Sequence, residues 1–168
     1  MEMILANTIH GLSRFVHENK PDMIVVHGDR VEALAGAIVG SMNNIIVSHI
    51  EGGERSGTID ELIRHSVTKL SHLHLVANEE AKQRVLQMGE DEKSVFIIGS
   101  ADIDIMKSGQ LPMISQVKEY YEIPYDQYHI VIFHPVTTEA QYFNQYANEL
   151  VDALIESQEN YVVIFPNN

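Results

Sequence analysis

The sequence contains no cysteine, which excludes disulfide bonds, thiolate metal sites and a cysteine nucleophile. It has no apolar run near the ~18 residues that a membrane-spanning helix needs, and its first ten residues, MEMILANTIH, lack the basic region and cleavage site of a signal peptide. Basic residues are scarce: 11 Lys and Arg stand against 24 Asp and Glu, a formal charge of −13. Nucleic acids and anionic membranes select basic surfaces, so neither is expected as a partner. These absences predict a soluble, cytoplasmic protein.

Several common catalytic motifs are also missing. The chain has no Gly-x-Gly-x-x-Gly fingerprint, Walker-type phosphate loop, Gly-x-Ser-x-Gly elbow or His-Glu-x-x-His helix. Redox and nucleoside-triphosphate chemistry therefore lose their usual support. What is present is a hydrophobic content of 45% in 168 residues, the composition of a globular chain as long as one domain or parts of two.

Short apolar runs alternate with stretches of helical periodicity. The predicted strands are 23–27, 45–50, 73–77, 95–98, 130–134 and 161–165, and the predicted helices are 31–42, 59–70, 79–88 and 139–157. Near-continuous apolar runs suit strands that are buried on both faces. Strands that alternate with helices of this length predict βαβ units, and hence an α/β fold with a parallel, Rossmann-like sheet.

The rhythm breaks between residues 108 and 128, which contain Gly109, Pro112 and Pro124. We interpret this stretch as a connection with at most one short helix, between part of one domain (1–107) and the opening βαβ unit of another (129–168). A lone unit of about forty residues buries too little surface to fold alone. We therefore expect a piece of a longer two-domain protein that is inactive by itself. Residues 108–168 carry a single base, Lys118, against eight acids, so we expect phosphate-binding groups to lie beyond Asn168.

Three carboxylates follow strands or begin a helix at the edge where parallel sheets bind ligands. Asp29 follows the first strand, Glu51 follows the second, and Asp60 lies shortly after Glu51. Asp29 could simply cap a helix, and Asp60 could favour a helix dipole. Glu51 directly follows a buried strand, where a charge needs a partner or a purpose. Together the three acids favour acid–base chemistry.

The basic and imidazole side chains allow structural as well as functional interpretations. Arg64 follows Asp60 by four residues, so a local ion pair is the simple expectation. His72 and His74 share a strand face, a spacing that could bind a metal, but they precede the strand's ligand-binding end. His134 ends a strand of the second domain and is expected to face the cleft between domains. His27 and His49 each lie close before a candidate acid, and either could be a buried residue with satisfied ring nitrogens.

Longer motifs resemble a known family. The runs HGDRVEALAGA (27–37), HIEGGERSGTIDELIRHSVTKLSH (49–72), FIIGSADIDIM (96–106), FHPVTTE (133–139) and FPNN (165–168) are similar to those of hydrolysing UDP-N-acetylglucosamine 2-epimerases. The resemblance runs from about residue 20 to the end of the chain. It implies two Rossmann-like domains of glycosyltransferase-B type with the nucleotide sugar between them, of which the opening strands and most of the second domain are missing here.

The resemblance also implies roles for individual residues. Asp29, Glu51 and Asp60 match the acids implicated in catalysis. The implied substrate-binding residues are Arg30, Arg64, His134, Asn167 and Asn168. The implied reaction eliminates UDP to give a glycal and then adds water, which needs no redox cofactor and no metal. The implied partners are a UDP-sugar and other copies of the same protein.

Alternatives to this function remain open. A relative acting on UDP-N,N′-diacetylbacillosamine would carry the same motifs. A metal-dependent hydrolase would use His72 and His74, and a non-catalytic module would bind the nucleotide sugar without turnover.

Overall fold

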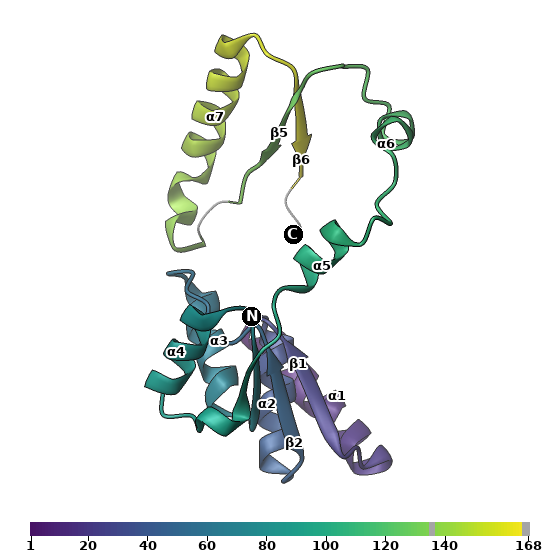
Figure 1. Ribbon diagram of the computed structural model, residues 1–168. Coiled ribbons are helices and arrows are strands. Elements are labelled where there is room, and N and C mark those ends of the chain that lie inside the picture. Colours follow the sequence, from purple (N-terminus) through teal and green to yellow (C-terminus); the bar gives the residue numbers. More distant parts are fainter. Residues whose placement is uncertain (135–136, 166–168) are drawn as a thin grey trace. The chain divides into compact units, whose positions relative to one another are not determined.

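The computed structural model describes residues 1–134 and 137–165 (Figure 1). The chain divides into two compact units, Met1–Gly109 and a second unit that begins at Gln110. Helices and strands alternate along both, so the predicted α/β class is confirmed. In the described part of the chain, no helix is both long and apolar enough to cross a lipid bilayer.

The first unit is built on a four-stranded sheet. Its strands are β1 (Met23–His27), β2 (Ile46–Ile50), β3 (Leu73–Val76) and β4 (Val95–Ile97). They pair in the order β1-β2-β3-β4, all parallel, with Met23 opposite Ile46 and Ser48 opposite Leu73. Because every strand runs the same way, their carboxyl ends meet at one edge, as the sequence predicts.

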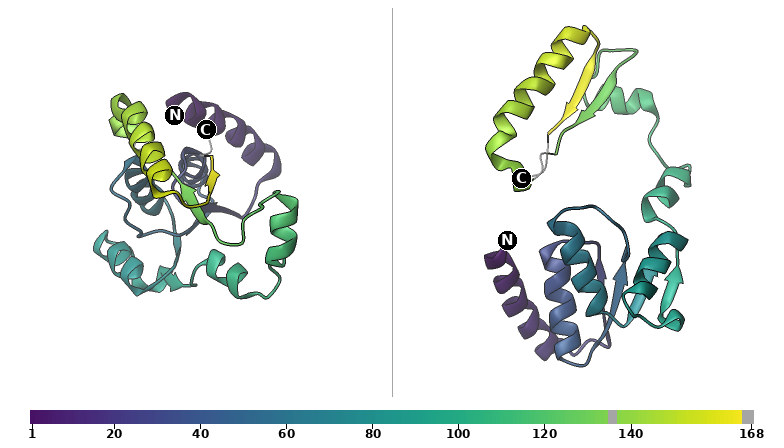
Figure 2. Two further views of the ribbon diagram at one scale, coloured as in Figure 1. Left: turned by 90° about the horizontal axis from the view of Figure 1, so that it is seen from above. Right: turned by 90° about the vertical axis from the view of Figure 1, so that its left-hand side faces the viewer.

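A helix precedes the first strand of this unit, and a helix follows each strand. These helices are α1 (Glu2–Asn19), α2 (Val31–Met42), α3 (Ile59–Lys69), α4 (Glu79–Gln87) and α5 (Ala101–Lys107), with a short 3-10 turn, η1 (Glu92–Ser94), before β4. Helix α1 packs along α2 (Figure 2), and neither α1 nor α5 was among the predicted helices.

The core lies between one face of the sheet and helices α2, α3 and α4. Val26 and Val47 contact apolar residues of α2 and α3, and a second cluster joins Val76 to α4. Helix α2 comes very close to the sheet because it presents glycine there. A Cβ on Gly36 would lie 2.7 Å from a Val26 methyl, and a Cβ on Gly40 would lie 2.4 Å from a Val47 methyl.

The opposite face of the sheet differs from the expectation of strands buried on both faces. Met23, Val25 and Phe96 point to this face and are exposed. No element among the described residues of the first unit buries these three side chains, so their apolar character is not explained by packing within that unit.

The second unit contains a parallel pair of strands, β5 (His129–Ile132) and β6 (Tyr161–Ile164). Between them lie a 3-10 turn, η2 (Thr137–Tyr142), and α7 (Phe143–Ser157). The short helix allowed for between 108 and 128 is α6 (Ile114–Tyr120). Ile130 and Ile132 of β5 are 61% and 56% exposed, as befits a single βαβ unit with little core.

Candidate active site

The turn between β1 and α2 presents Asp29 at the carboxyl edge of the sheet. Gly28 makes this turn with φ +73°, and its N–H donates to the Ile50 carbonyl of the neighbouring strand at 3.0 Å. The N-cap residue of α2 is Arg30, not Asp29. The helix-capping interpretation of Asp29 is therefore wrong, and its carboxylate has another partner.

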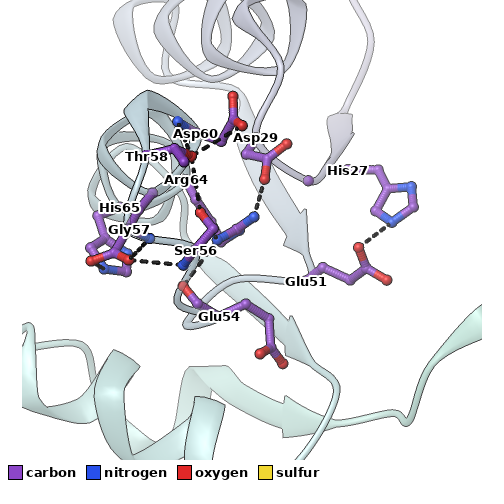
Figure 3. A network of polar contacts seen from close by, with 12 residues as sticks. His27, Asp29, Glu51, Glu54, Ser56, Gly57, Thr58, Asp60, Arg64 and His65 are labelled. Carbon is purple, nitrogen blue, oxygen red and sulfur yellow. Dashed lines mark hydrogen bonds and ion pairs between the residues drawn. The ribbon is translucent and has the colours of Figure 1, made fainter. Parts of the chain in front are cut away.

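That partner is Arg64 of α3 (Figure 3). Its Nη2 donates to an oxygen of Asp29, and its Nη1 donates to the Glu54 carbonyl at 3.1 Å and to Ser56 Oγ at 3.3 Å. The Arg64 side chain is only 10% exposed. The expected i,i+4 pair with Asp60 is thus wrong: the guanidinium reaches across to the preceding βα turn and binds the loop before its own helix.

Asp60 lies in the first turn of α3, where Thr58 is the N-cap. The Asp60 N–H donates to Thr58 Oγ1 at 3.3 Å, and the Thr58 hydroxyl donates to the Asp60 carboxylate at 3.2 Å. A further acid, not singled out from the sequence, completes this turn: Glu61 accepts from the N–H groups of Ser56 and Gly57, each at 2.8 Å. These two backbone donors lower the pKa of Glu61.

Glu51 leaves strand β2 in the left-handed conformation, with φ +66°. Its N–H donates to the Leu75 carbonyl at 2.9 Å, which extends the sheet pairing by one residue. Its carboxylate lies 3.0 Å from Nε2 of His27, the last residue of β1 (Figure 3). The partner that this charge requires is therefore an imidazole on the neighbouring strand.

The loop between Glu51 and α3 is anchored on α4. Arg84 Nη1 donates to the Gly53 carbonyl at 2.8 Å, and Asn78 Nδ2 donates to Glu54 Oε1 at 3.2 Å. A Cβ on Gly53 would lie 2.3 Å from the Ala81 carbonyl oxygen, so only glycine allows this approach. The sequence gives no sign of the contact, because it joins residues that are far apart in the chain.

Histidines 72 and 74 have separate structural partners. His72 Nδ1 accepts from the Val47 N–H at 3.1 Å. His74 is fully buried, with Nε2 3.2 Å from Glu90 Oε2, and burial lowers the pKa of His74. Within residues 1–134 and 137–165, no group of three or more His, Asp or Glu side chains is placed to hold a metal ion.

Of the remaining predicted binding residues, the structure describes Arg30 and His134. Arg30 is exposed, and its side chain makes no hydrogen bond or ion pair with any described residue. His134 is also exposed and belongs to the second unit. Asn167 and Asn168 lie outside the described residues.

Two curated proteins are similar to the chain along its whole length. It is 55% identical over 168 residues to a UDP-N-acetylglucosamine 2-epimerase of Neisseria meningitidis serogroup B, covering 100% of this chain and 45% of that protein. It is 32% identical over 169 residues to a UDP-N,N′-diacetylbacillosamine 2-epimerase (hydrolyzing) of Legionella pneumophila, again covering 100% and 45%. The chain thus spans about half the length of these relatives.

The fold is also that of a solved enzyme. The crystal structure of UDP-GlcNAc 2-epimerase from Neisseria meningitidis bound to UDP-GlcNAc matches with a TM-score of 0.82 and 20% sequence identity, over 99% of this chain and 48% of that one. This likeness confirms the predicted fold type. The family model described as UDP-N-acetylglucosamine 2-epimerase matches residues 1–168. With a family match over residues 1–168 and a relative at 55% identity, the chain belongs to the UDP-N-acetylglucosamine 2-epimerase family.

Proposed function

We propose that the complete protein carrying this chain is a hydrolysing UDP-N-acetylglucosamine 2-epimerase, which converts UDP-N-acetylglucosamine and water to N-acetylmannosamine and UDP. The observation that carries the proposal is the gathering of acids at one edge of the parallel sheet. Asp29 follows β1, Glu51 follows β2, and Asp60 lies one helical turn before Arg64, the partner of Asp29. The hydrolysing subtype has further support in the name of the Legionella relative.

The reaction needs proton transfer at both faces of the sugar. In the first step a carboxylate removes the C2 proton, the C1–O bond breaks, and its electron pair leaves with UDP, giving a C1=C2 glycal. In the second step the oxygen of water adds to C1, and a proton returns to C2 from the opposite face. Asp29, Glu51 and Asp60 would share these acid–base roles, since each comes from a different segment around the same edge.

The substrate would be held by groups outside this trio. Arg30 is an exposed cation beside Asp29 and suits a phosphate oxygen. His134, Asn167 and Asn168 would complete the site from the second domain. Arg64 would act on Asp29 instead, because its guanidinium is already engaged by that carboxylate and by the Glu54 carbonyl. Residues 1–107 and 129–168 would be parts of two domains joined by 108–128, in a homo-oligomeric cytoplasmic enzyme.

The test is turnover of UDP-N-acetylglucosamine by the complete protein in D₂O. We expect UDP and free N-acetylmannosamine with deuterium at C2 in equal amounts. Release of UDP-N-acetylmannosamine would contradict the hydrolysing subtype, and tight UDP binding without turnover would indicate a non-catalytic module. UDP-N,N′-diacetylbacillosamine is the second substrate to test, because the Legionella relative is named for it.

The site assignment needs its own variants. Asp29→Asn, Glu51→Gln and Asp60→Asn should each lower kcat by about 10²-fold or more, the usual contribution of a general acid or base. Asp22→Asn is the matched control, because Asp22 is exposed and precedes β1 at the other end of the strand. Wild-type turnover in all three amide variants would show that the assignment is wrong.

A further inference from the structure

A fully buried histidine lies behind the proposed catalytic edge. His49 is on β2, paired in register with Val26 of β1 and His74 of β3, and no part of its side chain is exposed. A polar ring at such a position is costly unless its nitrogens are hydrogen-bonded. Both nitrogens of His49 have partners: Nε2 lies 2.9 Å from the Gly28 carbonyl oxygen, and Nδ1 lies 3.1 Å from Thr68 Oγ1.

The partners define the tautomer. A carbonyl oxygen only accepts, so Nε2 carries the proton and donates to Gly28. Burial lowers the pKa of His49 to about 4, so the ring is neutral near pH 7 and Nδ1 accepts from the Thr68 hydroxyl. The same Oγ1 lies 3.0 Å from the Arg64 carbonyl oxygen, one turn earlier on α3, so its single proton is shared between that oxygen and Nδ1.

These contacts connect His49 to the segments that carry both members of the ion pair. Gly28 immediately precedes Asp29, and Arg64 is the partner of Asp29. The imidazole of His49 therefore holds the Asp29 side through the Gly28 carbonyl, and it holds the Arg64 side through Thr68, which lies one turn after Arg64 on α3.

The loop that carries Glu51 closes over this connection. A Cβ on Gly52 would lie 3.1 Å from both His49 Nδ1 and Thr68 Oγ1, so the loop backbone lies directly against the hydrogen bond between them.

We propose that His49, acting with Thr68, is a positioning residue that sets the geometry of the Asp29–Arg64 pair at the catalytic edge. The inference rests on the proposed function for its effect on turnover, but not for its effect on the ion pair. If His49 only filled space in the core, a neighbour could lose its hydrogen bond to His49 without effect as long as its volume were kept. If His49 positions the ion pair, the loss of that hydrogen bond should matter.

Thr68 offers a sharp test, because valine has nearly the same shape without the hydroxyl. In the complete protein we expect Thr68→Val to lower kcat by about tenfold to 10²-fold, since small displacements of catalytic groups have effects of this size, while KM changes by less than about twofold. Thr68→Ser keeps the hydroxyl and should restore most of the lost kcat. Ser71→Ala is the matched control: Ser71 is a buried hydroxyl just after the end of α3, and it donates to the Val67 carbonyl at 2.7 Å and not to His49.

A second measurement does not depend on activity. If His49 and Thr68 position the ion pair, Thr68→Val and Asp29→Asn both weaken the same set of contacts. The loss of Tm in the double variant should then be smaller than the sum of the two single losses. Ser71→Ala combined with Asp29→Asn should give additive losses. A parent protein without turnover would refute the proposed function, while this cycle would still decide the positioning role. Additive Tm losses, or a Thr68→Ser variant as slow as Thr68→Val, would overturn the inference.

Discussion

Gly53 combines two constraints that a single added methyl group should expose. Its φ is +81°, and a Cβ there would lie 2.3 Å from the Ala81 carbonyl oxygen. Its own carbonyl accepts the Arg84 hydrogen bond that anchors the loop following Glu51. Gly57 in the same loop also has a positive φ, +66°, but nothing lies within 4 Å of its Cβ position. The pair separates backbone strain from steric exclusion.

The expected magnitudes follow from these distances. An alanine held at positive φ costs about 1–2 kcal/mol, and this is the whole effect expected of Gly57→Ala. In Gly53→Ala the loop must also retreat from Ala81, which adds about 1–3 kcal/mol of overpacking. The retreat weakens the Arg84 hydrogen bond, worth about 1.5–3 kcal/mol when the donor is charged. We therefore expect Gly53→Ala to lower the free energy of unfolding by about 4 kcal/mol.

The assay is urea unfolding of the complete protein followed by far-UV circular dichroism, because this chain contains no tryptophan to report by fluorescence. Turnover of the UDP-sugar is measured on the same samples. Gly53→Ala should lose turnover because the loop that begins at Glu51 moves, whereas Gly57→Ala should retain most of it. Equal stability losses in the two variants would refute the steric argument.

Four further predictions concern single residues. Gly11→Ala should raise the free energy of unfolding by about 0.4–1 kcal/mol, seen as a higher Tm, because this exposed glycine of α1 has open space around its Cβ position. Asp29→Asn should cost about 2–4 kcal/mol in urea unfolding, since it leaves the Arg64 guanidinium without its counter-ion. The pKa of His49 is about 4 in the folded protein and 6.5 in the unfolded chain. The contribution of neutral His49 to stability is therefore full above pH 6.5 and is lost as pH falls toward 4. Over this range the urea midpoint should fall more steeply with falling pH in the parent protein than in His49→Gln. Arg30→Gln should raise KM for the UDP-sugar with little change in kcat, as steady-state kinetics will measure.

The strands and four of the helices, α2, α3, α4 and α7, could be predicted because their apolar patterns are continuous. The strand Met23–His27 and the helix Val31–Met42 have the predicted bounds, and the strand Ile46–Ile50 begins one residue later than predicted. In such runs the buried side chains recur once per helical turn or at alternate strand positions, so the local sequence pattern predicts the element. Helix α1 gives a weaker signal: of its 18 residues, only Val16 is buried, and its N-cap Met1 offers no side-chain acceptor.

The candidate site shows where local reasoning ends. The prediction that Asp29 and Glu51 lie at one edge follows from parallel topology alone. Their partners do not. The i,i+4 rule pairs Arg64 with Asp60, yet the guanidinium binds Asp29, 35 residues away, because α3 packs beside the β1–α2 turn. The His27–Glu51 contact likewise depends on the register of β1 against β2.

These contacts determine which cations of this negatively charged chain are free to bind a diphosphate. A diphosphate ligand needs positive groups, and Arg64, which contacts one of the proposed catalytic acids, is already engaged by that acid, Asp29. The imidazole of His27 is likewise engaged by Glu51. Arg30 differs from both, because it is exposed beside Asp29 and makes no side-chain hydrogen bond or ion pair within the described residues. Both arginines lie in the motifs of the family, but their surroundings differ. Arg64 is suited to orienting an acid, and Arg30 is suited to binding a phosphate.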